Sequence, residues 1–373
     1  MRMRSRTTDL KKWLIATCAA TEDQDSDDIM ALCKGGCVMK NIWKEGVMGV
    51  VTGDALGCPV QFEERDKVAS HPVTGMRGMG TFNLPAGSWT DDSSLTLALL
   101  DSIVRTGRMN LKDIMANFVD WLDNGAFTPY GYSYDIGNGT YDAISAYKRK
   151  GNPFECGGKD EWNNGNGSLM RIMPACLYCY TKGMTDEDAI RAVHAVGSLT
   201  HGHLRANIAC GLYFFMVREI LDGEDRLTDR MQKGLDQGFA YYGKTPANQA
   251  ELAYYGPLRN LEAFAQTPAE EIRSTGYVVD TLKAVVWALI TTASFEEALL
   301  KVVNLGKDSD TTGAIAGGLA ALYYGYQAIP EAWLAEIKKR EWIEELCEKA
   351  DLRTAPDRGA AGSAGYNQAA GVN

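Results

Sequence analysis

The sequence lacks an excess of basic residues, and this absence limits the partners that the protein can have. It contains 38 Lys and Arg residues against 48 Asp and Glu residues, so its net charge is −10. A surface that binds nucleic acid through phosphates needs a basic stripe, and this composition argues against one. The sequence also lacks an uninterrupted apolar run of membrane-spanning length, so we expect no membrane partner.

Histidine is scarce, and cysteine does not follow a disulfide pattern. The nine cysteines are an odd number at uneven spacings, unlike the compact framework of a small secreted domain. We therefore expect reduced thiols and a cytoplasmic location. Cys176 and Cys179 form a CxxC pair on an apolar helical segment, which we interpret as core packing. Only four histidines occur, and the pair His201 and His203 has no further zinc ligands nearby.

Alternating apolar and polar residues, the pattern of a half-buried strand, are nearly absent. Helical periodicity dominates instead: apolar residues recur every fourth position in 91–104, and Gly107 follows where a C-cap glycine is expected. Ser294 and Glu297 have the spacing of a capping box. The sequence therefore predicts an all-α fold with functional loops between many helices.

The domain organisation predicted from composition is one large domain between two extensions. With 45% hydrophobic residues, the 373-residue chain can bury a large core. No Pro, Ser or Gly-rich linker divides 44–352, which we predict to be a single domain. Residues 1–43 form an N-terminal extension, and the small, polar residues 353–373 are expected to form a flexible tail.

Two short stretches place more oxygen ligands before an apolar helix than capping requires. One is the stretch "GSWTDDSSLTLALL" at 87–100, and the other is "GKDSDTTGAIAGG" at 306–318. Capping of the helix N-terminus is the simpler interpretation. Carboxylates and hydroxyls are also the ligands of Mg²⁺ and Mn²⁺, and two such clusters face to face make a two-metal site. The candidate ligands are Thr90, Asp91, Asp92, Asp308, Asp310 and Thr311.

Small residues follow the second acidic stretch at helical spacing. Gly313, Gly317 and Ala321 form a slim helix face, which allows another helix to approach closely. We expect this close packing to hold the second acidic loop against the first.

Three further stretches allow both a functional and a structural interpretation. The loop "NNGNGSLMRIMP" at 163–174 offers backbone N–H groups to a phosphate, although an ordinary turn explains it equally well. His201 stands at a helix start, where a structural role is more common than a functional one. Asp135 is a carboxylate inside a loop of tyrosines, which line a ligand cleft or simply pack.

Taken in order, these motifs resemble the ADP-ribosylglycohydrolase family. The resemblance covers most of the chain and rests on the motifs "GDALG", "WTDDSS", "DIGN", "GNGSLMR", "THGH" and "DSDTTGAIAGG". It implies a compact multi-helix, orthogonal all-α bundle with a binuclear Mg²⁺ or Mn²⁺ centre in a cleft. It also implies hydrolysis of the bond between ribose C1″ and an acceptor such as an arginine guanidinium, with release of ADP-ribose.

The resemblance also implies roles for individual residues. The six acidic and hydroxyl residues named above correspond to the metal ligands, and Asp135 to a carboxylate near the scissile bond. The "GNGSLMR" motif corresponds to a cradle for the pyrophosphate, and His201 to a contact on the nucleotide side. The implied substrate-binding residues are Gly165, Asn166, Gly167, Ser168, Met170 and His201.

One position departs from the family pattern. The family commonly has a Glu after "GDALG", a leading candidate for the general base, where this chain has Gln61. Glutamine cannot accept a proton, so the base is sought among Glu63, Asp92 and Asp135. The alternative is a protein that binds ADP-ribose or a related nucleotide without turning it over.

Overall fold

The computed structural model describes residues 41–354. Most of the expected N-terminal extension and C-terminal tail lies outside the described residues. Within them, the first helix starts at Ile42 and the last ends at Thr354. The domain boundaries therefore stay predictions.

The described residues form helices and contain no β-strand, which confirms the all-α prediction. No helix among them is long and apolar enough to span a bilayer. The α-helices are α3 (Ile42–Gly57), α4 (Arg65–Ser70), α5 (Asp91–Thr106), α6 (Leu111–Asn124), α7 (Asn138–Lys150), α8 (Met173–Thr181), α9 (Asp186–Gly197), α10 (Leu204–Asp222), α11 (Leu227–Tyr242), α12 (Pro246–Leu252), α13 (Leu261–Phe264), α14 (Val278–Ile290), α15 (Phe295–Val303), α16 (Ser309–Tyr324), α17 (Glu331–Leu334) and α18 (Arg340–Thr354). Short 3₁₀ helices cover Cys58–Val60, Gly80–Phe82, Pro153–Glu155, Glu161–Asn163, Ala253–Arg259, Ala269–Glu271 and Tyr326–Ala328.

The expected helix ends are found where the sequence places their caps. Gly107 ends α5 with φ 72°, in the left-handed region that favours glycine. The hydroxyl of Ser294 accepts a hydrogen bond from the backbone N–H of Glu297 at 3.2 Å. The Glu297 carboxylate accepts from the N–H of Ala293 at 2.9 Å, one residue earlier than a strict capping box requires.

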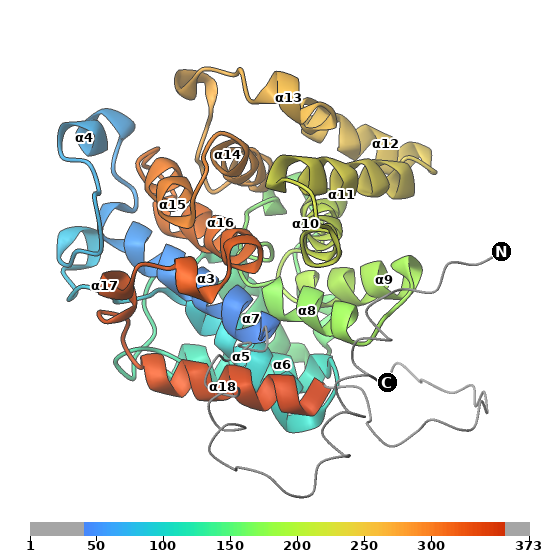
Figure 1. Cartoon of the computed structure of the whole chain (residues 1–373). Helices are drawn as coiled ribbons and strands as arrows, with labels where there is room; N and C mark the ends of the chain where they lie inside the picture. Colours follow the sequence, from blue (N-terminus) through green and yellow to red (C-terminus); the bar gives the residue numbers. More distant parts are fainter. Residues whose placement is uncertain (1–40, 355–373) are drawn as a thin grey trace, which may run out of the picture. The chain divides into compact units, whose positions relative to one another are not determined.

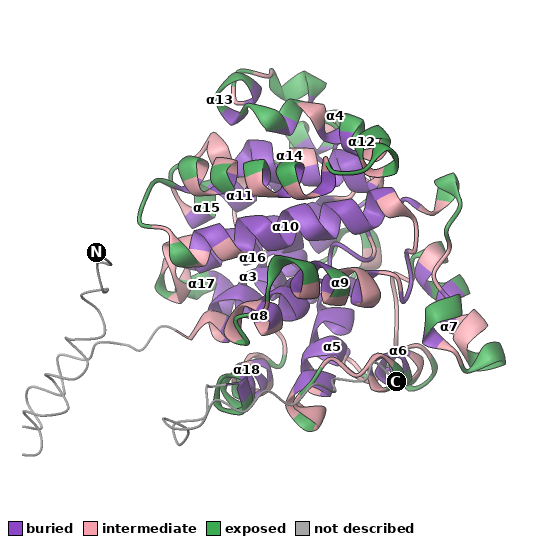
Figure 2. Cartoon of the chain, turned by 90° about the vertical axis from the view of Figure 1, so that its right-hand side faces the viewer, coloured by how far each residue is buried: buried purple, intermediate pink, exposed green. Residues whose placement is uncertain are grey.

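Helices α3 and α16 lie side by side at the centre of the described domain (Figure 1). Helices α5, α8 and α18 pack against α3, and α10, α14 and α15 pack against α16. Figure 2 shows α5 and α10 as buried along nearly all of their length, whereas α7 and α18 each expose one face. The two central helices therefore form the core against which these six helices pack.

The central pair approaches at glycines, as the slim face of α16 predicts. A Cβ atom on Gly53 would lie 1.9 Å from the backbone oxygen of Gly313, and one on Gly317 would lie 2.1 Å from that of Gly49. Real Cβ atoms are never this close to a backbone oxygen, so only glycine permits the approach. This contact brings the start of α16 next to the end of α3.

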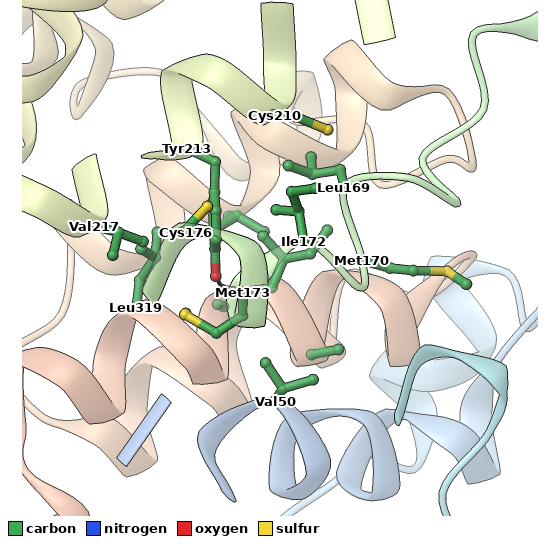
Figure 3. Close-up of a cluster of buried hydrophobic side chains, with 14 of the residues drawn as sticks. Val50, Leu169, Met170, Ile172, Met173, Cys176, Cys210, Tyr213, Val217 and Leu319 are labelled. Carbon is green, nitrogen blue, oxygen red and sulfur yellow. Dashed lines mark hydrogen bonds between the residues drawn. The ribbon is translucent and has the colours of Figure 1, made fainter. Parts of the chain in front are cut away.

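Apolar side chains from four helices fill the space beside this pair. Figure 3 shows Val50 of α3, Met173 and Cys176 of α8, Tyr213 of α10 and Leu319 of α16 in one buried cluster. Cys176 and Cys179 are both buried free thiols in α8, which confirms their interpretation as core residues. The described cysteines form no disulfide with one another.

Candidate functional site

A cavity of about 480 Å³ opens where the starts of α5 and α16 meet. It is lined by Gln61 and Phe62, by residues between 135 and 140, by the loop at Gly165–Gly167, by His201 and by the first turn of α16. The "WTDDSS", "DIGN", "GNGSLMR", "THGH" and "DSDTT" segments, far apart in the sequence, thus contribute to one site. Of the described positions, this is where the motifs converge.

The first residues of α5 and α16 do not cap their helices with their side chains. Thr90 and Asp308 occupy the N-cap positions, yet neither side chain accepts a capping hydrogen bond. The Thr90 hydroxyl oxygen lies 3.0 Å from Asp54 Oδ1, 3.2 Å from Asp92 Oδ2 and 3.3 Å from Asp310 Oδ2. The Asp308 side chain lines the cavity and accepts a hydrogen bond from Asn166. Neither N-cap side chain therefore caps its helix.

Buried carboxylates gather at this point without enough donors. Asp54, Asp92 and Asp310 each place one oxygen within 4.8 Å of the others. The Oδ1 atoms of Asp92 and Asp310 are buried and have no hydrogen-bond partner among the described residues. The Thr311 hydroxyl reaches Asp92 Oδ2 at 3.4 Å. Unpaired buried carboxylate oxygens are costly, and a bound cation would satisfy them.

The pKa values of the clustered carboxylates also indicate a cation site. Burial first, and the neighbouring carboxylates next, raise the pKa values of Asp91, Asp92 and Asp310 well above the usual range of aspartate. Burial also raises the pKa of Asp308 to about 6. A divalent cation would let these groups ionise together, so the residues present fit a metal site of hard oxygen ligands.

Asp54 is a site residue to which the sequence analysis assigned no role, although it lies in the quoted "GDALG" motif. It accepts hydrogen bonds from the backbone N–H groups of Thr90 and Ser93 at 3.0 Å and from the Ser93 hydroxyl at 2.5 Å. Burial raises its pKa to about 7, and these hydrogen bonds hold it lower than burial alone would. Both oxygens of Asp54 have donors, so this residue of α3 holds the start of α5 in place by hydrogen bonds.

Gln61 and Asp135 form a pair at the edge of the acidic cluster. Gln61 Nε2 donates to Asp135 Oδ2 at 2.9 Å, and Gln61 Oε1 is buried without a partner among the described residues. Asp135 has φ 54°, an uncommon value for a residue other than glycine. Burial raises the pKa of Asp135, while the hydrogen bond from Gln61 opposes that rise.

The structure does not bring Glu63 into the cavity. Its carboxylate pairs with Lys67 one turn along the chain, at 2.8 Å. The neighbouring Glu64 is exposed and pairs with Lys307. Of the four candidate catalytic residues, Asp92, Asp135 and Gln61 meet at the acidic cluster, and Glu63 is turned away to the surface.

The predicted cradle is divided between the cavity and the core. Gly165, Asn166, Gly167 and Met170 line the cavity. Ser168 does not line it; its side chain is fully buried, with its hydroxyl 3.6 Å from the sulfur of Cys210. Asn166 donates to Asp308 Oδ2 at 2.5 Å, so the loop is tied to the start of α16.

The two neighbouring histidines have different surroundings. His203 caps α10, because its Nδ1 accepts a hydrogen bond from the N–H of Arg205 at 3.1 Å. His201 lines the cavity, and its Nδ1 lies 2.8 Å from the hydroxyl of Thr200. Burial, and then the charge of Arg171, lower the pKa of His201 to about 3, so its ring is neutral at physiological pH.

The comparisons identify the class of protein to which this all-α fold with an acidic cavity belongs, and it is a class of hydrolases. The sequence profile of the ADP-ribosylglycohydrolase family matches residues 42–360. The chain belongs to this family, whose members hydrolyse glycosidic bonds.

Characterised relatives and a solved structure agree with this assignment. The chain is 30% identical to the ADP-ribosylarginine hydrolase Tri1 of Serratia proteamaculans (strain 568), over 82% of this chain and 78% of the relative. It is also 30% identical to the ADP-ribosyl-[dinitrogen reductase] glycohydrolase of Rhodospirillum rubrum, over 78% of this chain and 88% of the relative. A solved ADP-ribosylglycohydrolase-related protein complex matches with a TM-score of 0.66 at 30% identity, over 84% of this chain and 98% of that chain.

Proposed function

We propose that the protein hydrolyses the bond between C1″ of ADP-ribose and a guanidinium nitrogen of a modified arginine, using two Mg²⁺ or Mn²⁺ ions. The observation that carries this proposal is the pair of buried oxygens, Asp92 Oδ1 and Asp310 Oδ1, that lack any donor among the described residues. The relative from Serratia proteamaculans is an ADP-ribosylarginine hydrolase by name, which supports the choice of arginine. The buried free thiols agree with a reducing, cytoplasmic location.

Six residues around the acidic cluster would hold the ions. When bound, the ions would neutralise the buried carboxylates and offer Lewis-acid contacts to the ribose hydroxyls and the diphosphate. Asp54 is left outside this set because Thr90 and Ser93 already satisfy its oxygens. The proposed ligands are Thr90, Asp91, Asp92, Asp308, Asp310 and Thr311.

The loop at Gly165–Gly167 is proposed to bind the diphosphate of the substrate. The backbone N–H groups of Gly165 and Gly167 donate to no backbone acceptor in the described residues, and both glycines line the cavity. Free N–H groups at such a loop bind phosphate oxygens well. Asn166 and Met170 of the same loop would flank the ligand, while the buried Ser168 would support the loop from below.

Asp135 is the proposed general base. It lines the cavity next to the acidic cluster, and Gln61 holds its carboxylate by a hydrogen bond of 2.9 Å. Asp135 would take a proton from water as the water oxygen bonds to C1″. The C1″–N bond breaks with its electron pair on nitrogen, and the neutral guanidine that leaves then takes up a proton. Gln61 thus positions the base rather than acting as one.

The test is release of free ADP-ribose from an ADP-ribosyl-arginine protein, with Mg²⁺, with Mn²⁺ and with a chelator. We expect release that depends on the metal. Calorimetric binding of ADP-ribose to the same preparation provides the reference for a folded, ligand-competent protein. Binding without release from any ADP-ribosylated acceptor would contradict the hydrolase proposal.

A binding protein without turnover is the second candidate, and Gln61 is the observation that favours it. If this is correct, Gln61→Glu gains hydrolysis that the wild-type protein lacks. If Asp135 is the base, the wild-type protein is already active.

A further inference from the structure

Arg171 is a fully buried cation without an acidic partner. Its side chain is 0% exposed, and its hydrogen bonds within residues 41–354 go to a carbonyl and a hydroxyl rather than to a carboxylate. Its guanidinium lies over the ring of Phe118 at 4.8 Å, and its Nε has no hydrogen-bond acceptor. Burial lowers the pKa of Arg171 to about 10. Burying an unpaired charge is costly, so stability alone does not explain this residue.

The charge of Arg171 is linked to the cavity through one hydroxyl. Arg171 Nη2 donates to Thr200 Oγ1 at 2.7 Å, and the same oxygen lies 2.8 Å from His201 Nδ1. Arg171 also reaches the carbonyl of Val196 at 3.4 Å. The chain of contacts therefore runs from the core, through Thr200, to a histidine that lines the cavity.

The direction of the hydrogen bonds in this chain follows from the donors available. A guanidinium can only donate, so the Thr200 oxygen accepts from Arg171. The Thr200 hydroxyl is buried, and among the described residues His201 Nδ1 is its remaining hydrogen-bond partner, which can accept the proton. An unpaired buried hydroxyl is costly, so Thr200 donates to Nδ1. The neutral ring must then carry its proton on Nε2.

The Nε2 edge of His201 faces the cavity. Cβ atoms built on Gly139 and Gly165 would lie 3.0 and 3.2 Å from Nε2, and one on Gly167 would lie 2.7 Å from Cε1. The ring is thus surrounded by backbone at three cavity-lining glycines. Nε2 itself has no hydrogen-bond partner among the described residues. A donor is therefore directed into the cavity beside the glycine loop.

We propose that Arg171 and Thr200 are positioning residues that hold His201 in the Nε2–H form, so that it donates to a phosphate oxygen of the ligand. The identity of the ligand rests on the proposed function, whereas the state of the ring does not. Arg171 fixes the hydroxyl of Thr200, its charge adds to the effect of burial in keeping the ring neutral, and neither Arg171 nor Thr200 touches the ligand.

The first test measures ADP-ribose affinity by calorimetry in two backgrounds, with Mg²⁺ present. In the wild-type background, Arg171→Met and Thr200→Val are each expected to raise the dissociation constant by on the order of tenfold. Thr200→Ser keeps the hydroxyl and is expected to retain wild-type affinity. In the His201→Gln background, neither Arg171→Met nor Thr200→Val is expected to weaken binding further, because both act through His201.

The second test determines which ring nitrogen of His201 carries the proton. Nitrogen NMR of the wild-type protein is expected to show a protonated Nε2 and an unprotonated Nδ1 for His201, assigned by its absence in His201→Gln. In Arg171→Met, the hydroxyl is released from the guanidinium, so a fraction of Nδ1–H and a higher protonation midpoint of the ring are expected.

Three outcomes would overturn the inference: an Nδ1–H ring in the wild-type protein, equal losses of affinity in both backgrounds, or failure of Thr200→Ser to retain affinity. If Arg171→Met does not fold, the Thr200 variants and the ring spectrum still decide. If the wild-type protein does not bind ADP-ribose, the proposed function fails, and the ring spectrum still tests the arrangement of Arg171 and Thr200.

Discussion

Single carboxylates around the cavity differ in what satisfies their oxygens. Asp54 receives donors from Thr90 and Ser93, whereas Asp92 and Asp310 each leave one buried oxygen without a donor. Asp135 stands between these cases, because Gln61 donates to one of its oxygens. The number of hydrogen-bond donors thus distinguishes these aspartates. Asp54 supports the start of α5, Asp92 and Asp310 are candidate metal ligands, and Asp135 is the candidate base.

The role of Asp135 predicts a loss of turnover with little loss of binding. Asp135→Asn is expected to lower the rate of ADP-ribose release by about 10²–10⁴-fold, since an amide cannot accept the proton of water. The dissociation constant for ADP-ribose should change by about threefold or less. Glu63→Gln is the matched control, because Glu63 pairs with Lys67 outside the cavity. An equal rate loss in both variants would reject the assignment of Asp135.

His194 predicts part of the pH dependence of stability. Burial lowers its pKa to about 4, and its ring stacks on Tyr242. A histidine with a depressed folded-state pKa contributes stability above its unfolded pKa of about 6.5 and loses it as the pH falls toward 4. Between pH 6.5 and pH 5, the free energy of unfolding of His194→Gln should therefore fall less than that of the wild-type protein. The difference between the two slopes should be about 1 kcal/mol per pH unit. Parallel urea titrations of both proteins, with Mg²⁺ present, measure the difference; identical slopes would contradict it.

At the scale of helices, the contact between α3 and α16 positions the acidic cluster. Asp54 follows Gly53 on α3, and Asp310 lies three residues before Gly313 on α16. The two glycines are in backbone contact, so the spacing of the helices fixes the spacing of the carboxylates that they carry. Packing in the core and the geometry of the site are thus set by the same residues.

This contact predicts a strong effect of one methyl group. Gly53→Ala would place a Cβ 1.9 Å from the Gly313 oxygen, so we expect it to destabilise the fold by on the order of 3 kcal/mol. Gly256→Ala is the control, since a Cβ there meets nothing within 4 Å. Chemical denaturation of both variants measures the effect, and equal stabilities would refute the close contact.

At the scale of the whole molecule, metal binding should be coupled to folding. Mg²⁺ or Mn²⁺ at 100 times its dissociation constant is expected to stabilise the native state by about 2.7 kcal/mol, or several degrees in melting temperature. Asp310→Ala should abolish this shift. Asp120→Asn, a change on the exposed side of α6, should preserve it. A full metal-induced shift in Asp310→Ala would show that Asp310 is not a ligand.

The sequence predicts the helical class and most of the cavity, and the reasons for its failures are physical. Ordered motifs indicate Asp308 and Asp310 as candidate ligands, because residue type and spacing are local properties of the sequence. The role of Asp54 is not predictable in this way, because its donors come from a helix 36 residues further along the chain. Glu63 lies only two residues after Gln61, but the backbone of Phe62, with φ 65°, intervenes and directs Glu63 to Lys67.

The glycine contact between α3 and α16 also has a consequence for ion choice. Mg²⁺ requires short bonds to oxygen of about 2.0–2.1 Å, whereas Ca²⁺ takes bonds of about 2.3–2.6 Å. A side chain of any size at Gly49 or Gly317 would push the helices apart. Asp54 on α3 holds the start of α5, so moving α3 away from α16 would also move Asp91 and Asp92 away from Asp308 and Asp310. In the proposed metal site, this wider separation of the carboxylates would favour the larger ion. Glycines that do not touch the ion would then contribute to the choice of ion.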